Sequence, residues 1–445
     1  ANAFWTMKLT STEEGRALYG PNFINADDAT LLHACSVSNP MCDVGHFGPH
    51  FMTFHIAFLL QYERSLMSID PLIEALPYWD MTYDAVDGAY RDDPDLYIFT
   101  DKYFGDFFTT TPDNTVNNGL FANFPMANWT ADRFGPESYM AQTTGAPCLL
   151  EGWFEPPQNT ECLRCCGVPD CACGTDDVYP TYLRNHDNCA PYIARDPLAE
   201  PMYGGSHEIV YTQDAFDACS TVENTPLWMS WQNCIEISYI SCNGTAMHVA
   251  DAPFTLGPHF VPGLDANCQN LDIYGFYDHA NGTRIYVPFF HSNAHVKFGL
   301  DMLDVVTSPN DAAAFTGYHA NIDRSRVYWM LSAPSDYAAK DWTFPKKQIP
   351  VGGGNPPYGV CGPFSTYDLL NCHDAEKYPD YDKSKPWLTL VDDVVNPGYP
   401  FFNLFDNCDD CDGGENGYTH AEILYLTAPE RTPYTYDTLA HLYYD

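Results

Sequence analysis

The clearest pattern in the chain is a recurrence of apolar residues every three to four positions, which is typical of helices. It is strongest in PHFMTFHIAFLLQYERSLMSI, residues 49–69. The residues that share one face of this stretch are Phe51, Phe54, His55, Phe58, Leu59 and Tyr62. The pattern predicts a long helix that begins at a proline, a residue well suited to the first helical turn.

A short helix is predicted at DDATLLHAC, residues 27–35, with Asp27 or Asp28 as its cap. Leu31, Leu32 and His33 would face the interior of the protein. Two further helices are predicted between His291 and residue 329, the second within AAAFTGYHANIDRSRVYW, residues 312–329.

The rest of the chain has weaker patterns. Residues 1–25 read as turns, and residues 84–290, rich in Pro, Gly, Asn and aromatic side chains, read as long loops with short strands. That middle segment is too long for a simple connection, so it should hold structure of its own. Residues 420–439 are predicted to contain an apolar strand. The fold class that follows is mainly α.

The formal charge is −39, from 59 acidic and 20 basic residues. Such a field repels phosphate, which argues against a nucleic-acid or anionic-membrane partner. No apolar run approaches about 18 residues, so no membrane span is predicted.

Seventeen cysteines and three acceptor motifs for N-glycosylation, at Asn128, Asn243 and Asn281, indicate a secreted protein from an oxidising compartment. The start ANAFW reads as a mature end left by cleavage of a signal peptide. The cysteines are densest in ECLRCCGVPDCACG, residues 161–174, which predicts a disulfide-stapled insertion. A zinc site there is the alternative that an oxidising compartment disfavours.

Histidine is the residue that carries candidate chemistry. His291 and His295 lie four residues apart, on one face of a predicted helix, and a third imidazole from a facing helix would complete a three-nitrogen metal site. Neutral imidazole binds copper, zinc, iron and nickel. The alternative is that these are ordinary histidines, of which the chain has 15.

The sequence around both groups of histidines resembles one family. SPNDAAAFTGYHANIDRSRVYW, residues 308–329, is similar to the second copper signature of tyrosinases, catechol oxidases and molluscan hemocyanins. GHFGPHFMTFHIAFLLQYERSL, residues 45–66, resembles the first signature, in which two histidines are nine positions apart, as His46 and His55 are. LPYWD, residues 76–80, and YTYD, residues 434–437, are also similar to family motifs.

The resemblance implies a four-helix bundle around a binuclear type-3 copper centre, wrapped by long loops and short strands. One copper domain would span residues 1–445, with the cysteine-rich insertion at about 148–250. The ligands it implies are His33, His46 and His55 for the first copper ion, and His291, His295 and His319 for the second. Phe315 would form a hydrophobic wall of the substrate pocket, and Asp323 would form an ion pair with Arg324.

The activity that the resemblance implies is oxidation of o-diphenols to o-quinones with O2. Ser292 follows His291 where many tyrosinases carry Asn, and no acid lies between Ala280 and Phe290. We therefore expect weak or absent monophenol hydroxylation. Two alternatives stay open, an oxygen carrier and an extracellular matrix or filament protein that keeps the fold. Self-assembly is compatible with either.

Overall fold

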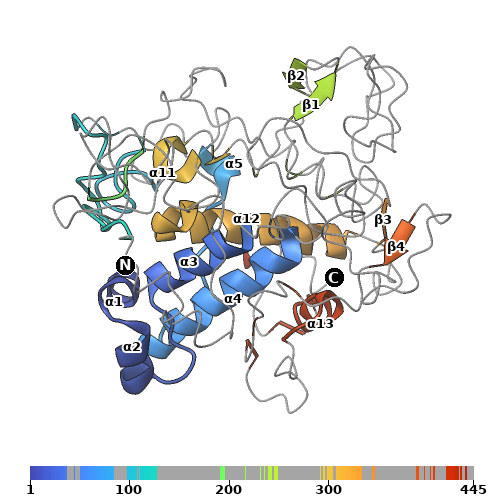
Figure 1. The fold of residues 1–445 in the computed structure, drawn as a ribbon, viewed down its shortest axis with the longest axis horizontal. Helices are drawn as coiled ribbons and strands as arrows, with labels where there is room; N and C mark the ends of the chain where they lie inside the picture. Colours follow the sequence, from blue (N-terminus) through green and yellow to red (C-terminus); the bar gives the residue numbers. More distant parts are fainter. Residues whose placement is uncertain are drawn as a thin grey trace, which may run out of the picture.

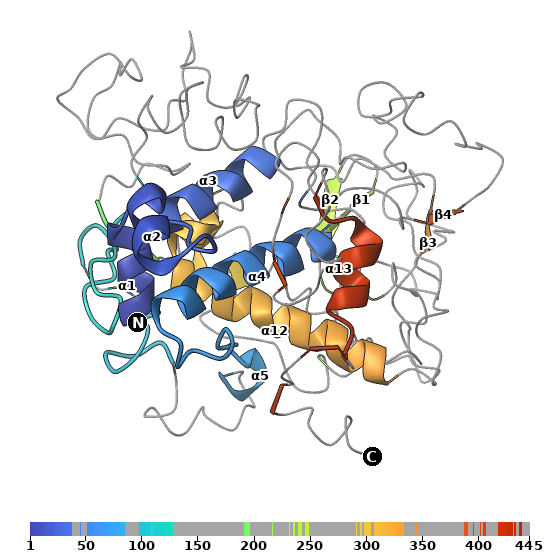
Figure 2. The same cartoon turned by 90° about the horizontal axis from the view of Figure 1, so that it is seen from below.

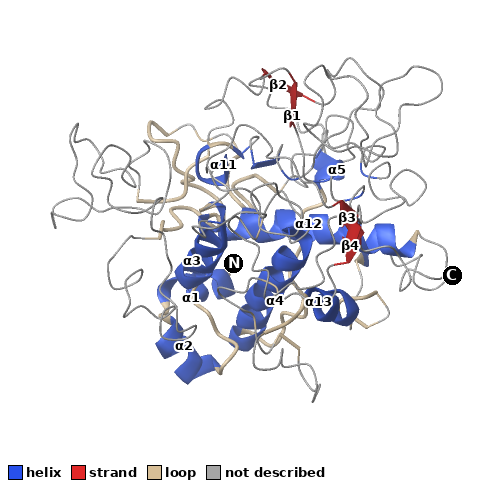
Figure 3. Ribbon diagram, turned by 45° about the vertical axis from the view of Figure 1, so that its right-hand side comes forward, coloured by secondary structure: helices blue, strands red, loops and turns tan. Residues whose placement is uncertain are grey.

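The computed structural model of the chain describes part of its length. The described residues are 1–37, 45, 51–84, 98–107, 109, 111–127, 191–195, 216, 231, 235, 239–242, 245–248, 291, 294–295, 298–303, 307–332, 343–345, 387–389, 395, 401, 404–405, 417–429, 431–432 and 436–437. Within them the structure is mainly helical, as predicted (Figures 1 and 3). The cysteine cluster of residues 161–174 lies outside these ranges.

Two helices stand where the sequence predicted turns. Helix α1 spans Asn2–Leu9 and α2 spans Thr12–Tyr19. The Ser11 hydroxyl accepts a hydrogen bond from the backbone N–H of Glu14, which caps the start of α2. Gly20 ends it with a positive φ of 103°, a conformation that glycine adopts without strain. The prediction of turns over residues 1–25 is therefore wrong for both helices. Both are short, and α2 is fixed by its caps, whereas α1 has no side-chain cap and buries Ala3, Phe4 and Met7.

Helix α3 spans Ala26–Val37, which confirms the helix predicted there. Its cap is Asn25, two positions before Asp27, because the side chain of Asn25 accepts from the backbone N–H of Asp27. Asp27 instead forms an ion pair with Lys8, and Asp28 accepts from the hydroxyl of Thr12. The amide of Asn25 also donates to three backbone carbonyls, at residues 7, 8 and 10. The start of α3 is thus fixed against the end of α1.

The centre of the fold is a pair of long helices, α4 (Phe51–Ile69) and α12 (Ala312–Leu331). They pack against each other, and α3 and α13 lie alongside α4 (Figures 1 and 2). Almost every residue of α12 is buried, so this helix has no solvent-facing side. A helix that is apolar or covered on all sides belongs to the interior of a large domain. None of the helices in the described ranges is both long enough and apolar enough to span a membrane.

Helix α13 spans His420–Leu426, where an apolar strand was predicted, so that prediction is wrong. The reason is a reciprocal capping box. The hydroxyl of Thr419 accepts from the N–H of Glu422, and the Glu422 carboxylate accepts from the N–H of Thr419. These bonds satisfy the backbone N–H groups of Thr419 and Glu422, which have no partner within the first turn of a helix.

The shorter elements connect the long helices. They are α5 (Met81–Asp84), α11 (Leu300–Leu303) and the 3-10 turn η3 (Ser308–Asn310), which contacts α3, α11 and α12. Two antiparallel pairs of strands occur among the described residues. In the first, β1 (Tyr239–Cys242) pairs with β2 (Thr245–His248), and in the second, β3 (Thr343–Pro345) pairs with β4 (Trp387–Thr389). In Figure 1 these short strands lie away from α3 and α4.

Residues 191–195 tie the middle of the chain to the N-terminus of α12. Their backbone bonds to residues 114–116 on one side and to residues 124–126 on the other. From this ribbon the side chain of Arg195 reaches Asp311, the residue just before α12, with Nε–Oδ2 and Nη2–Oδ1 distances of 2.7 and 3.1 Å. Both side chains are buried. A bidentate pair of this kind satisfies both charges in the interior.

Replacing one partner of this pair should be costly. We expect Asp311→Ala to lower the free energy of unfolding by about 3–5 kcal/mol, because Arg195 stays buried without its counter-ion. Urea unfolding measures the change. The control is Asp101→Ala, at an exposed aspartate.

The double variant Arg195→Met/Asp311→Ala should lose less than the sum of the two single losses. Strict additivity of the single changes would contradict a direct coupling between the two side chains.

Candidate metal centre

Five of the six histidines predicted to bind metal lie in described parts of the chain, and they converge. His33 comes from α3, His55 from α4 and His319 from α12, while His291 and His295 stand in a further helical segment. Each is at most 2% exposed. The sixth, His46, lies outside the described residues. Burying five imidazoles together requires that each polar nitrogen has a partner, since an unsatisfied buried group is costly.

The tightest group is formed by His55, His291 and His319. One ring nitrogen from each lies within 4.8 Å of the others, a separation that one metal ion can bridge. The rings of His55 and His319 stack with centroids 4.7 Å apart. His33 flanks the group beside His55, at 5.5 Å, and His295 flanks it beside His291, at 4.7 Å. The group therefore combines one histidine of the first predicted trio with two of the second, so the division into two trios stays a prediction.

Hydrogen bonds to backbone carbonyls fix the orientation of three of these rings. In each, Nδ1 carries the proton and donates it to a carbonyl oxygen, so Nε2 keeps its lone pair. The three bonds are His55 Nδ1 to the Phe51 carbonyl (2.7 Å), His319 Nδ1 to the Phe315 carbonyl (2.8 Å) and His295 Nδ1 to the Met302 carbonyl (2.6 Å). In most metal sites of proteins, one nitrogen of the imidazole binds the metal and the other donates a hydrogen bond of this kind, which keeps the ring neutral and fixes its orientation.

The distance between His291 Nε2 and His295 Nε2 is 3.1 Å. If both nitrogens bind one ion at about 2.0–2.1 Å, the usual length of an imidazole–zinc bond, they subtend an angle of about 100° at the metal. That angle is close to tetrahedral, so the spacing of this i, i+4 pair would allow both nitrogens to bind one ion, and an all-imidazole donor set suits copper.

Aromatic rings form the walls of this cluster. Phe315 stacks on His319 at 3.9 Å and also contacts His33 at 5.3 Å. Phe51 lies between the two sides, 4.6 Å from His55 and 4.4 Å from His291. Phe315 was predicted to be a wall of the site, whereas Phe51 was predicted only to share a helix face with His55. The signal was available, because Phe51 precedes His55 by four residues, as Phe315 precedes His319. Such walls exclude water from the nitrogens.

Tyr318 is a further buried contact of the cluster. Its ring lies 4.8 Å from His319 and 5.5 Å from His295. Ser292, the second residue assigned to the substrate pocket, lies outside the described residues, as do the glycosylation sites Asn128, Asn243 and Asn281.

Helix α12 is held in place by the segment of residues 76–80, whose sequence LPYWD resembles a family motif. The backbone N–H of Trp79 donates to the carbonyl of Gly317 at 2.8 Å. The two segments pack closely here, because a Cβ at position 317 would lie 3.7 Å from the backbone and side chain of Trp79, in ordinary van der Waals contact. Two positions further along α12 stands His319, so this contact sets where the ring lies.

The ion pair expected between Asp323 and Arg324 is not formed, and that prediction is wrong. Arg324 instead binds Asp80, through both guanidinium Nη atoms, and bonds Asn321 through Nε at 2.8 Å. Asp323 binds Arg326 at 2.7 Å and accepts from the hydroxyl of Tyr436, also at 2.7 Å. Neighbouring residues on a helix point in different directions, so a pair at i, i+1 cannot meet.

Asp84, a titratable residue, contacts Trp79, which bonds to helix α12. The Oδ2 atom of Asp84 accepts from the indole N–H of Trp79. Burial raises the pKa of Asp84 from its ordinary value of 3.8 to about 7, and the nearby charge of Asp80 adds to the rise, while the Trp79 bond opposes it. In the folded protein Asp84 therefore keeps its proton up to about pH 7 and loses it as pH rises further.

A buried cluster of imidazoles on paired helices is a candidate histidine-rich metal centre. Comparison with known proteins shows the family to which the chain belongs. The family described as "Common central domain of tyrosinase" matches residues 23–165 and 220–332. The match covers more than half of the chain, and the chain belongs to the tyrosinase family.

Individual relatives match over shorter stretches. The tyrosinase of Streptomyces glaucescens is 32% identical over 102 residues, which are 23% of this chain and 34% of that protein. The tyrosinase of Gallus gallus is 27% identical over 141 residues, 32% of this chain and 24% of that protein. The chain thus aligns with about a third of the length of the Streptomyces relative. A polyphenol oxidase variant from Thermothelomyces thermophila matches 76% of this chain and 68% of its own, at 18% identity and a TM-score of 0.38. That structural likeness is weak, and the family assignment rests on sequence.

Replacing one candidate ligand should weaken metal binding without preventing folding. Loss of a group that only supports a ligand costs roughly 10–100-fold in metal affinity. We expect His55→Asn to weaken copper binding by more than this, because it removes a nitrogen of the central group. Metal analysis of the purified variant after exposure to copper measures this.

The matched control is His420→Asn. His420 is also buried against α4, where its Nδ1 lies 2.5 Å from the hydroxyl of Thr53, but it is not in the metal-binding group. It should lower stability and leave bound copper unchanged. Equal copper loss in both variants would show that the loss reflects disrupted packing.

The pKa of Asp84 predicts a pH-dependent stability. Between about pH 4 and pH 7 the folded state holds a proton that the unfolded state releases, so the contribution of Asp84 to stability falls as pH rises through that window. Asp84→Asn keeps an acceptor for Trp79 without the charge. It should match wild type near pH 4 and exceed it at pH 8 by on the order of 1–3 kcal/mol.

Urea unfolding at pH 4, 6 and 8 measures this difference. Asp101→Asn, at an exposed carboxylate, should show no such trend. A stability gap between Asp84→Asn and wild type that is constant with pH would contradict the assignment.

Proposed function

We propose that this chain is a type-3 copper oxidase that converts o-diphenols into o-quinones with O2. The observation that supports this most directly is the convergence of His55, His291 and His319 from three separate parts of the chain. Their positions belong to the family signatures, and their nitrogens lie close enough to share an ion.

The proposal assigns two copper ions to the centre. His33, His46 and His55 would hold the first, and His291, His295 and His319 the second. When bound, copper supplies the redox chemistry that takes electrons from a diphenol and passes them to O2. Imidazole ligands are neutral, so they add no charge to the buried site.

The chain's own residues prepare the centre in three ways. Carbonyl bonds from Phe51, Phe315 and Met302 hold the imidazoles in the tautomer that binds metal. The rings of Phe51 and Phe315 keep water away from the nitrogens. A planar apolar wall also suits a phenolic ring, so we assign Phe315 and Ser292 to the substrate pocket.

Monophenol hydroxylation is proposed to be weak or absent. Ser292 stands where many tyrosinases carry Asn, and residues 281–290 hold no carboxylate that could orient a water for deprotonating a phenol. The relatives are named tyrosinases, and one other, from Streptomyces griseus, is named grixazone synthase. Those names support phenol oxidation as the class of reaction and leave the preferred phenol to experiment.

We further propose that the protein is secreted. The support is the count of 17 cysteines together with the three glycosylation motifs. Small phenols and O2 are then the partners, and the net charge of −39 makes nucleic acid an unsuitable one.

Oxygen uptake by the copper-loaded chain tests the proposal. We expect rapid uptake with catechol and little or none with L-tyrosine, and we expect Ser292→Asn to raise the rate with L-tyrosine relative to catechol. The His55→Asn variant, which lacks a central ligand, is the inactive control.

The possible results separate the candidate functions. Comparable rates with both substrates in the wild-type chain would overturn the claim of weak hydroxylation. Reversible O2 binding with negligible catechol turnover would replace the oxidase with an oxygen carrier. A folded chain that binds no copper would favour a matrix or filament protein.

A further inference from the structure

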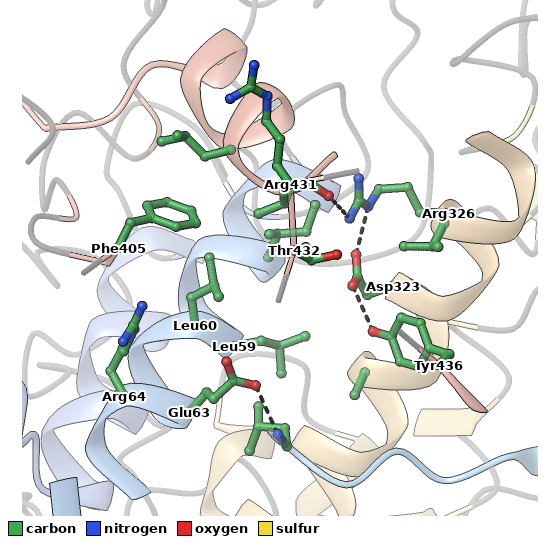
Figure 4. Close-up of a pocket in the computed structure, with 16 residues that line it drawn as sticks. Leu59, Leu60, Glu63, Arg64, Asp323, Arg326, Phe405, Arg431, Thr432 and Tyr436 are labelled. Atoms are coloured by element: carbon green, nitrogen blue, oxygen red, sulfur yellow. Dashed lines mark hydrogen bonds and ion pairs between the residues drawn. The ribbon is translucent and has the colours of Figure 1, made fainter. Parts of the chain in front are cut away.

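A cavity separate from the histidine cluster lies between α4, α12 and the residues around α13 (Figure 4). Its volume is about 100 Å³. On α4 the side facing the histidines carries Phe51, Phe54, His55 and Phe58, whereas Leu59, predicted to share that face, lines the cavity. The apolar lining residues are Ile56, Leu59, Leu60, Leu76, Ala320, Val327, Phe405 and Leu426. No histidine lines it, so it is a separate site.

The charged residues around this cavity bind one another or the backbone. Arg326 donates through Nε to Asp323 at 2.7 Å and through Nη2 to the carbonyl of Thr427 at 3.1 Å. The other carboxylate oxygen of Asp323 accepts from Tyr436 at 2.7 Å. These bonds are drawn in Figure 4, on the α12 side of the cavity. The charges on this side are therefore balanced within the protein.

The α4 side is arranged in the same way. The Glu63 carboxylate accepts from the backbone N–H of Leu76 at 2.9 Å, and Arg64 donates through Nε to the carbonyl of Leu404 at 2.8 Å. Arg431 donates to the hydroxyl of Tyr425, and its guanidinium lies 3.5 Å from the centre of that ring. Figure 4 shows this guanidinium turned toward α13 and away from Glu63. Arg431 is exposed, whereas Glu63 and Arg326 are buried, so a charged ligand that displaced their bonds would leave buried groups unsatisfied.

An uncharged apolar molecule would meet no such penalty, because it contacts the leucine, isoleucine and valine side chains between the charged groups. The volume of the cavity limits the size of the ligand. An engineered cavity of about 150 Å³ lined by Leu, Ile and Phe stays dry and binds benzene, so a cavity near 100 Å³ suits one small ring. We propose that this cavity binds a small uncharged aromatic molecule, and that the occupant stabilises the pairing of α4 with α12.

The stabilising effect of the occupant follows from which helices form the walls of the cavity. Ile56, Leu59 and Leu60 belong to α4, Ala320 and Val327 belong to α12, and the same two helices carry His55 and His319. A molecule that binds only while the two helices are paired favours the folded state by mass action. Occupancy should therefore protect the histidine centre, whether or not that centre oxidises phenols.

Toluene is a suitable probe, because it is uncharged, fits one ring and has no atom that binds copper. Calorimetry of the copper-loaded protein should show a saturable rise in Tm of about 1–2 °C with toluene. Leu60→Phe, which fills the cavity, should abolish that rise. The matched control is Leu18→Phe, the same change at an exposed leucine of α2, and it should keep the rise.

Bound toluene can also be located directly in the wild-type protein, so the test does not depend on whether Leu60→Phe folds. Nuclear Overhauser effects from toluene protons to the methyl groups of Leu59 and Leu60 are expected in the wild-type protein, even if Leu60→Phe fails to fold. No rise in Tm at saturating toluene would overturn the proposal. So would a rise that persists in Leu60→Phe, or Overhauser effects to residues of the histidine cluster alone, since both would place the ligand elsewhere.

Discussion

The structure depends on one local hydrogen bond, from the Nδ1–H of a histidine to the carbonyl four residues earlier on the same helix. It occurs at His55 with Phe51 and at His319 with Phe315. The bond requires a regular helix at that point, because only helical backbone brings residue i−4 beneath the ring. It also decides which nitrogen is left to bind a metal. Each phenylalanine thus has two roles, since its carbonyl orients the imidazole and its ring shields the cluster.

Helix α12 has to be placed as accurately as its histidine, and it is held at three heights by segments far away in the sequence. Arg195 binds Asp311 at its start, Trp79 bonds Gly317 at its middle, and Asp80 binds Arg324 nearer its end. Each contact uses a charge or a backbone group that is buried and therefore demands a specific partner. Apolar packing alone would let the helix slide or turn by small amounts, whereas these contacts define one position.

Much of the fold could be predicted from the sequence. Both long helices, at 51–69 and 312–331, were predicted, the first from its apolar spacing. Five of the six histidines predicted to bind metal are buried together, and their metal binding stays a prediction. Helices α1, α2 and α13 were missed because they are short, and capping decided α2 and α13 through Ser11 and Thr419. The partner of Arg324 was missed because Asp80 lies 244 positions away in the sequence, and no local pattern reports such a contact. The choice of Asp323 ignored the direction in which successive helical side chains point.

The two-sided use of α12 has a consequence for how this protein can change in evolution. Along a helix each residue turns the chain by about 100°. One residue inserted or deleted between Gly317 and Arg324 would rotate His319 away from the cluster relative to the contacts that Trp79 and Asp80 make with this helix. It would also turn Asp323 away from Tyr436. Substitutions can accumulate one at a time in this stretch, but its length is fixed, and we expect lineages of this protein to differ in the loops while keeping every residue count inside the helix.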